Sequence, residues 1–107
     1  MHAMTQGFEL VVTILDNQAI ISVIGELDFH SAPRLREQIL NVLNGGVVDL
    51  VIDLSQMEFV DSSGLGVLVM GLKRMRECDG SFKLRSPTAN TSKVLEISGL
   101  SKLLLVG

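Results

Sequence analysis

The chain has 107 residues, of which 47% are hydrophobic, and its formal net charge is −3. This length suits a single domain, and the composition is too apolar for a disordered chain. The mean hydropathy is +0.41, yet no stretch approaches the roughly 18–20 unbroken apolar residues of a membrane-spanning helix. We therefore predict no association with a membrane.

The charge pattern and the cysteine count exclude further classes of protein. The nine Lys and Arg residues are scattered and there is no Trp or Tyr, whereas a nucleic-acid binder usually carries a basic stripe with stacking aromatics. The single cysteine, Cys78, forms neither an intrachain disulfide nor a cysteine-based zinc site. No basic start precedes an apolar run, as it would in a secretion signal. The sequence predicts a cytoplasmic protein without a nucleic-acid partner.

The first half of the chain predicts a hairpin, a helix and a buried strand. Residues 1–7 are expected to be disordered or left over from cloning, and residues 8–107 to form the domain. Residues 8–15 and 19–24 are rich in β-branched side chains, and the short connection between them predicts an antiparallel hairpin. Ser31 is then expected as the N-cap of a helix, with a proline in its first turn and an Asn-Gly-Gly end.

The second half predicts a strand-helix alternation. A strand over residues 47–54 is apolar on both faces, which is typical of a central strand in a covered sheet. A helix over residues 61–77 follows, and a stripe of apolar residues is set toward the core, comprising Leu65, Leu68, Val69, Leu72 and Met75. The 100° turn per residue then puts Val67 and Met70 outward.

The end of the chain predicts three more elements. These are a strand over residues 81–85, a helix over residues 86–97 and a last strand over residues 100–106. The order β-β-α-β-α-β-α-β predicts a single α/β domain whose mixed sheet is mostly parallel after an N-terminal antiparallel hairpin.

Residues 61–66, Asp-Ser-Ser-Gly-Leu-Gly, are the most informative stretch. Asp61 and Ser62 are capping residues for the helix that they begin. Gly64 and Gly66 each cost about 1 kcal/mol relative to alanine in a helix, and such glycines often permit a close approach of other atoms to the backbone. Helix capping alone and a binding role both remain open on these residue types.

Nucleotide binding and catalysis are weakly supported. Val69 stands where a dinucleotide loop would have its third glycine, and there is no Gly-Lys-Ser/Thr phosphate loop. Neither Ser62 nor Ser63 has a glycine two residues before it, as a nucleophile elbow requires. His30 is the one candidate base beside Asp28, so a small hydrolase using Ser62 or His30 is a distant alternative. No cofactor and no metal are expected.

A third reading makes Ser62 the substrate of another enzyme. A phosphate there adds roughly −1.5 to −2 charges, which the N-terminus of a helix tolerates. Glu58, Asp61 and Asp28 would make the surface strongly negative. Together with the outward Val67 and Met70, this predicts a partner surface that phosphorylation switches.

Three motifs resemble those of a known family. Residues 59–68, Phe-Val-Asp-Ser-Ser-Gly-Leu-Gly-Val-Leu, closely resemble the signature of bacterial anti-sigma factor antagonists, which are stand-alone STAS domains. Residues 25–28, Gly-Glu-Leu-Asp, and 98–100, Ser-Gly-Leu, are similar to two further family motifs. The resemblance covers about residues 8–106.

The resemblance implies a function and a site. Ser62 would be phosphorylated by an anti-sigma factor serine kinase and dephosphorylated by a serine phosphatase, and Asp28 would lie near the phosphoserine. The unphosphorylated form would bind the anti-sigma factor and free a sigma factor, a partner switch of the kind used in stress responses, and the chain would not be an enzyme. The expected partner-binding residues are Asp28, His30, Asp61, Ser62, Ser63, Gly64, Gly66, Val67 and Met70.

Two further expectations follow from the resemblance. Family members usually continue into a C-terminal helix, whereas this sequence ends at Gly107, so we expect the helix to be either truncated or absent from this member. If it is absent, Leu103, Leu104 and Leu105 would leave part of the sheet uncovered and favour a weak homodimer. The alternative function within the family is a STAS scaffold or an accessory subunit of a lipid-transport assembly, which binds a protein partner without a phosphorylation switch.

Overall fold

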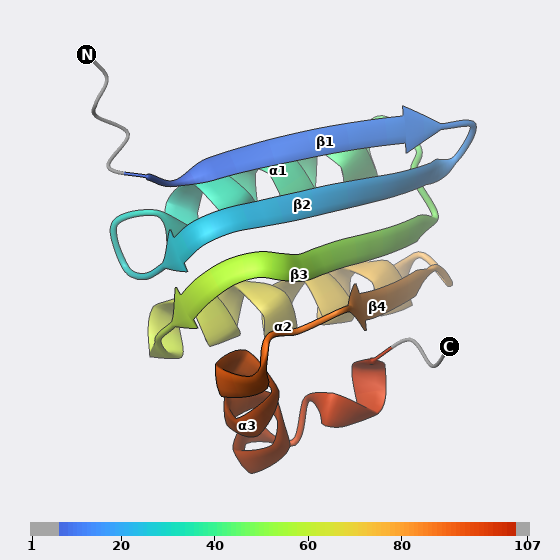
Figure 1. The fold of residues 1–107 in the computed structure, drawn as a ribbon. Helices are drawn as coiled ribbons and strands as arrows, with labels where there is room; N and C mark the ends of the chain where they lie inside the picture. Colours follow the sequence, from blue (N-terminus) through green and yellow to red (C-terminus); the bar gives the residue numbers. More distant parts are fainter. Residues whose placement is uncertain (1–6, 105–107) are drawn as a thin grey trace.

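Four strands form one mixed sheet, in the order β1-β2-β3-β4, in the computed structural model, which describes residues 7–104 (Figure 1). β1 (Glu9–Leu15) and β2 (Gln18–Leu27) form an antiparallel hairpin. β3 (Asp49–Val60) runs parallel to β2, and β4 (Ser81–Arg85) runs parallel to β3. The carboxyl ends of β2 and β3 therefore meet at one edge of the sheet, and the hairpin tip lies at the opposite end (Figure 1).

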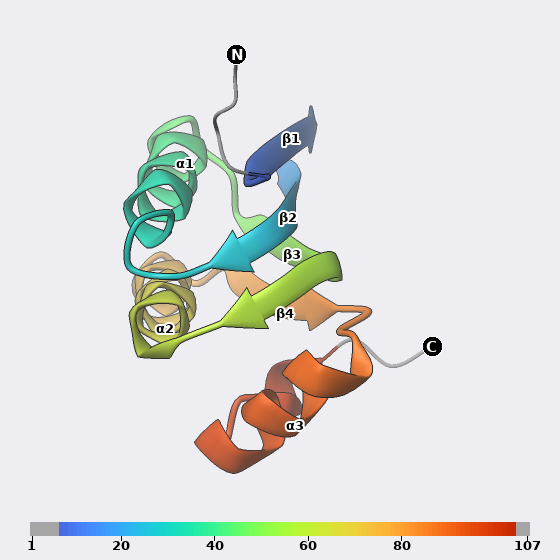
Figure 2. The same cartoon turned by 60° about the vertical axis from the view of Figure 1, so that its left-hand side comes forward.

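Two helices cover one face of the sheet. α1 (Ala32–Asn44) and α2 (Ser62–Glu77) lie side by side on that face (Figure 2). α3 (Ala89–Ser98) lies away from them and packs against β3, and a short 3-10 helix, η2 (Ser101–Leu103), follows it. Within residues 7–104, no helix combines the length and the apolarity that crossing a membrane would need.

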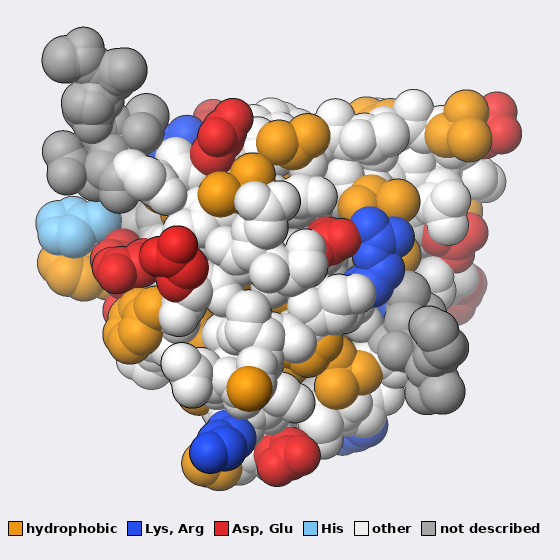
Figure 3. Space-filling view, viewed as in Figure 1, with side chains coloured by type: hydrophobic (Ala, Val, Ile, Leu, Met, Phe, Trp, Pro, Cys, Tyr) orange, Lys and Arg blue, Asp and Glu red, His pale blue; other side chains and the backbone are white. Residues whose placement is uncertain are grey.

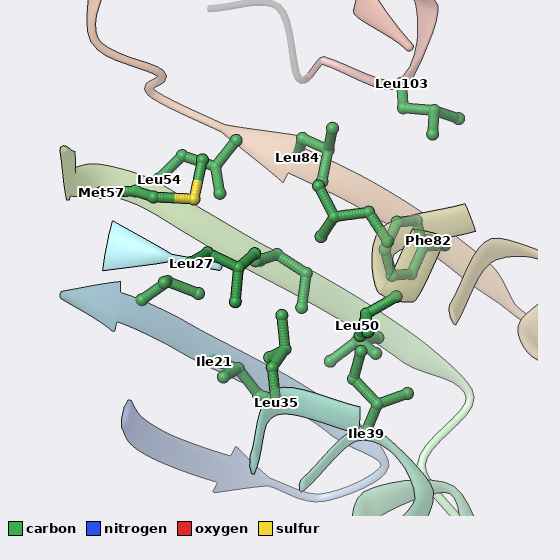
Figure 4. Close-up of a cluster of buried hydrophobic side chains, with 14 of the residues drawn as sticks. Ile21, Leu27, Leu35, Ile39, Leu50, Leu54, Met57, Phe82, Leu84 and Leu103 are labelled. Atoms are coloured by element: carbon green, nitrogen blue, oxygen red, sulfur yellow. The ribbon is translucent and has the colours of Figure 1, made fainter. Parts of the chain in front are cut away.

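The core forms between the sheet and these helices because side chains alternate along the strands. In β2, buried residues alternate with half-exposed or exposed ones from Ala19 to Leu27. Figure 4 shows that side chains from the strands and from α1 meet in one cluster. Its fully buried members include Ile21, Leu27, Leu35, Ile39, Leu50, Leu54, Met57 and Leu84.

Polar pairs hold β3 to β4 beside this core. The Arg85 guanidinium lies 2.6 Å from the Asp53 carboxylate, and the Ser81 hydroxyl donates to Asp49 Oδ1 at 2.7 Å. Burial raises the pKa of Asp53, but the backbone N–H of Ser55 and the Arg85 guanidinium outweigh burial and leave that pKa below its ordinary value.

The predicted fold class is confirmed, and the bounds of several elements differ from the prediction. β2 continues past Ile24 to Leu27, because it pairs with β3 that far. β3 extends to Val60, because it stays paired with β2 through two register shifts as far as Val60, which lies opposite Leu27. α3 begins after Thr88, whose hydroxyl caps the N–H of Thr91 at 3.3 Å. The earlier start predicted at Ser86 is wrong, since Pro87 disfavours a helical conformation in the residue before it and Ser86 has a positive φ of 57°.

The last strand, predicted over residues 100–106, is wrong for its first part. Leu100 and Leu103 are buried at the three-residue spacing of a 3-10 turn, so a turn rather than a strand places this apolar run. Leu104 forms a single parallel bridge with Leu84. The expectation that Leu103 is exposed is also wrong, since it is 5% exposed. Leu105 and residues 106–107 lie outside the described residues, as do residues 1–6.

Candidate functional site

The site predicted from the sequence lies at the edge where β2 and β3 end. Leu27 and Val60 are paired in the parallel register, so the residues that follow them are neighbours. The loop from Asp28 to Ser31 leads from β2 into α1, and Asp61 leads from β3 into α2. Segments more than thirty residues apart in the sequence thus meet at one edge (Figure 1).

Asp61 joins the two loops. Its Oδ1 accepts a hydrogen bond from the Gly64 N–H at 3.0 Å, which makes it the N-cap of α2. Its Oδ2 accepts from the Phe29 N–H at 3.1 Å, and its own N–H donates to the Leu27 carbonyl at 3.1 Å. The capping residue therefore also fixes the β2–α1 loop against the start of α2.

The β2–α1 loop is closed by hydrogen bonds of its own. Asp28 Oδ1 accepts from the N–H groups of His30 and Ser31 at 3.0 and 3.1 Å. The Ser31 hydroxyl accepts from the Asp28 N–H at 2.9 Å and donates to the Glu26 carbonyl at 2.7 Å. The N–H of Ser31 in particular holds the pKa of Asp28 below its ordinary value of 3.8. Asp28 is therefore a charged acceptor that shapes this loop.

Ser31 occupies the predicted N-cap position of α1, but not in the predicted way. Its side chain makes no capping hydrogen bond to the first turn, and its backbone is helical, with φ −95° and ψ −23°. The hydroxyl turns back toward β2 instead, and the residue is 6% exposed. The structure thus assigns Ser31 to the loop network rather than to helix capping.

Ser62 and Ser63 are the first two residues of α2, and both are exposed. The first N–H groups of a helix have no partner within the helix and carry partial positive charge. An acceptor group attached at Ser62 would lie beside these donors. The structure therefore presents a serine hydroxyl at a position that is open to another protein and suited to a negative charge.

Gly64 and Gly66 differ in what surrounds them. A Cβ added to Gly64 would lie 2.8 Å from the Leu27 carbonyl oxygen and 2.8 Å from a methyl carbon of Val60, so α2 packs on the sheet only without a side chain here. A Cβ on Gly66 would meet nothing within 4 Å. The fold requires the first glycine and leaves the second unexplained.

The orientation of α2 differs from the prediction. Val67, expected to point outward, is 8% exposed and belongs to the core. The prediction set Leu65 inward and ignored the glycines; the buried positions are Gly64, Val67, Leu68, Gly71 and Met75. Because a Cβ on Gly71 would lie 2.7 Å from the Phe82 ring, and one on Gly64 would lie 2.8 Å from Leu27 and Val60, these two glycines face the sheet. This rotates Val67 inward, and Met70 is half-buried.

Two aromatic residues that the sequence analysis missed supply the exposed apolar surface. Phe29 is 64% exposed and Phe59 is 49% exposed. The Phe29 ring lies 4.0 Å, centroid to centroid, from the His30 ring. The exposure of Phe59 could have been predicted from the sequence, because neighbouring residues of a strand point to opposite faces and Val60 is apolar. The exposure of Phe29 could have been predicted from its place in a polar loop between Asp28 and His30.

We call the surface formed by Asp28, Phe29, Phe59, Asp61 and Ser62 the serine edge. Figure 3 shows a histidine, acidic side chains and hydrophobic side chains together at the end of the molecule where β2 and β3 terminate. Of the predicted site residues, Asp28, Asp61 and Ser62 are brought together there, and His30 lies in the adjoining loop. Among residues 7–104, no three His, Cys, Asp or Glu side chains are placed to hold a metal ion.

A shallow hollow lies along the outer side of α2, one turn beyond Ser62. Its volume is about 310 Å³, and it is lined by Gly66, Val69, Met70, Lys73, Arg74 and Glu77. The absent side chain of Gly66 opens its end nearest the serine edge. Of the predicted partner-binding residues, Gly66 and Met70 are thus on the outer side, while Gly64 and Val67 are packed inside.

Comparison with known proteins adds independent evidence. The family model described as "Mlab, STAS domain" matches residues 10–107. The chain is 34% identical over 89 residues to the anti-sigma-B factor antagonist of Bacillus subtilis, a match that covers 83% of this chain and 81% of that protein.

Solved structures of similar fold agree. The unphosphorylated form of the anti-sigma factor antagonist SpoIIAA superposes with a TM-score of 0.83, at 23% identity and over 91% of this chain and 86% of that one. The phosphorylated form of the Bacillus cell fate determinant SpoIIAA gives a TM-score of 0.74, at 26% identity and over 92% and 88% of the two chains.

Proposed function

The chain belongs to the STAS-domain family of anti-sigma factor antagonists, and we propose that it acts as a partner switch controlled at Ser62. Its unphosphorylated form binds an anti-sigma factor that is also a serine kinase, so that a sigma factor is released. Phosphorylation of Ser62 ends this binding, and a serine phosphatase restores it. The protein works in the cytoplasm, uses no cofactor and has no catalytic activity of its own.

The exposed position of Ser62 at the start of α2 is the observation that carries this proposal. A kinase must reach the hydroxyl, and the first residue of a helix at an open edge is accessible from outside. A relative of the same fold is known in a phosphorylated and in an unphosphorylated form. These facts together favour Ser62, within the matched family motif, as the modified residue.

Exposed aromatic side chains give the partner a surface to bind. Phe59 lies near the end of β3, three residues before Ser62, and Phe29 lies in the β2–α1 loop that hydrogen-bonds to Asp61; both side chains are about half or more exposed. Burying aromatic side chains at an interface is favourable, and such residues often dominate binding energy. The Phe29 position is fixed through its N–H by Asp61, so the partner meets a preformed surface.

A phosphate on Ser62 acts against binding and not against folding. The helix N-terminus stabilises the negative charge within the protein, so the fold is retained. A partner packed on the serine edge would have to desolvate a group of roughly −1.5 to −2 charges close to the carboxylates of Asp61 and Asp28. Removing water from a charged phosphate costs far more free energy than removing it from a neutral hydroxyl. Phosphorylation therefore lowers the affinity for the partner.

The phosphorylation site is tested by mass spectrometry. Purified protein is incubated with ATP and with each candidate anti-sigma factor kinase from the same genome, and the intact mass is measured. We expect one added phosphate on the wild-type chain, none on Ser62→Ala, and one on Ser63→Ala, which is the matched control because both serines are exposed in the same turn. Phosphorylation of Ser62→Ala, or none of the wild type, would contradict the proposal.

The alternative function, a STAS scaffold or a lipid-transport accessory subunit without a phosphorylation switch, predicts a different partner. Affinity purification from the native host distinguishes the two. We expect an anti-sigma factor to co-purify with the unmodified chain, while co-purification of a transporter ATPase would favour the alternative.

A further inference from the structure

β1 forms one border of the sheet and carries exposed apolar side chains. Among residues 7–104 it pairs with β2 alone. Val11 is 44% exposed, Ile14 is 55% exposed and Leu15 is 71% exposed. An edge strand also presents backbone N–H and C=O groups that have no strand partner. This border therefore offers both hydrogen-bonding groups and apolar surface to another strand.

The faces of β1 follow from its register with β2. Val12 and Ile14 stand opposite the buried residues Ile21 and Ala19 and so lie on the helix-covered face, while Val11 and Leu15 stand opposite Ser22 and Gln18 on the other face. The sequence Val-Val-Thr-Ile-Leu over residues 11–15 is thus apolar on both faces about a central Thr13.

We propose that β1 of a second copy of this chain pairs antiparallel with β1, about a two-fold axis at Thr13, so that the sheet continues through a homodimer. Val11 then faces Leu15 of the other copy on one side, and Val12 faces Ile14 on the other. Facing residues in an antiparallel pair share a face of the sheet and interact. Each exposed apolar residue of β1 acquires an apolar neighbour, and Thr13 faces Thr13.

The position of Glu9 in the paired strands favours a two-fold axis at Thr13 over one at Val12. An axis one residue earlier, at Val12, would place the carboxylate of Glu9 opposite Leu15 and would leave Val11 facing Thr13. The axis at Thr13 instead pairs five residues of each copy with Glu9 outside the paired segment. The arrangement is self-complementary, as a two-fold interface must be.

The dimer is weak and leaves the serine edge open. A stable interface uses about 20–30 residues from each partner, whereas β1 contributes five paired residues and their neighbours. The hairpin tip lies at the opposite end of the sheet from the start of α2 (Figure 1). Pairing through β1 is therefore compatible with a partner at Ser62, and it stands or falls independently of the proposed function.

Disulfide trapping tests the axis directly and detects a weak dimer. In a Cys78→Ser background, which removes the exposed native thiol, Thr13→Cys places two thiols on facing residues about 4.5–5.5 Å apart at Cα, within the span of a disulfide. Val11→Cys is the matched control, because it lies on the same strand and face but about 14 Å from its own copy in this register.

Under mild oxidation, we expect the Thr13→Cys chain to form covalent dimers at least about tenfold faster than the Val11→Cys chain. Equal rates for the two chains, or no dimer from Thr13→Cys, would overturn the proposed register.

Charge exchange tests the facing pair. Val11→Lys alone and Leu15→Glu alone each set a charged side chain against an apolar one at both contacts and are expected to lower dimerisation, measured by sedimentation equilibrium. The two changes in one chain place a lysine against a glutamate at both contacts and are expected to restore it. A double variant as monomeric as Val11→Lys would contradict the pairing.

Discussion

Glycines lie on both the inner and the outer side of α2, but their surroundings differ. On the inner side, Gly64 and Gly71 let the helix approach the sheet so closely that a methyl group would overlap Leu27 or Phe82. On the outer side, Gly66 faces open space next to the exposed Ser62. The inner side positions the helix, and the outer side is free to meet a partner. A glycine in a helix therefore reveals its role only when its surroundings are known.

The largest expected effect is on the inner side. Gly64→Ala would place a methyl group against a backbone oxygen that cannot rotate away, and overpacking of this kind costs about 3 kcal/mol of unfolding free energy. Urea unfolding followed by circular dichroism measures it. Gly66→Ala is the control, and an equal stability of the two variants would remove the distinction between the two sides.

The next effect concerns the residue that joins the two loops. Asp61→Ala removes the cap of α2 and the acceptor of the Phe29 N–H, and the loss of an N-cap costs about 1–2 kcal/mol. Asp61→Asn keeps one carbonyl acceptor and should lose less. Binding of the anti-sigma factor should weaken more for Asp61→Ala than stability alone explains, because Phe29 loses its anchor. Calorimetric titration of each folded variant with the anti-sigma factor measures this loss of affinity.

A smaller effect of opposite sign is expected on the outer side. Alanine is favoured over glycine in a helix by about 1 kcal/mol, and nothing stands near the Gly66 position, so Gly66→Ala should raise the unfolding free energy by up to that amount. The added methyl group would at the same time obstruct a partner that approaches the helix backbone. Higher stability with unchanged partner affinity would show that Gly66 is not a contact.

The smallest expected effect is a change in acid sensitivity at the serine edge. The pKa of Asp28 is lowered in the folded protein, chiefly by the Ser31 N–H, so its contribution to stability is present above the ordinary pKa of 3.8 and is lost as the pH falls through the lower folded-state value. Asp28→Asn should therefore flatten the fall of stability below about pH 4. Thermal unfolding at a series of pH values measures it, and an unchanged slope would contradict the assigned interactions.

The sequence predicted the fold class, because periodicity and turn residues specify strands and helices. The nearness of Asp28 to Ser62 was expected from the resemblance to the family rather than from the strand pattern. The sequence did not predict the rotation of α2, since hydrophobicity gives glycine no inward preference, whereas close packing on Phe82 depends on it. It also missed the end of the chain, where an apolar run forms a 3-10 turn. Phe59 was missed because exposure depends on which face the helices leave open.

The central claim is that Ser62 controls partner affinity, and the most direct measurement is calorimetric titration of the cognate anti-sigma factor with two preparations of this protein. One preparation is phosphorylated at Ser62 by the kinase, and the other is unmodified. We predict at least tenfold weaker binding of the phosphorylated form, which corresponds to about 1.4 kcal/mol, with the same unfolding temperature for both or a slightly higher one for the phosphorylated form. Equal affinities for the two preparations would contradict the switch.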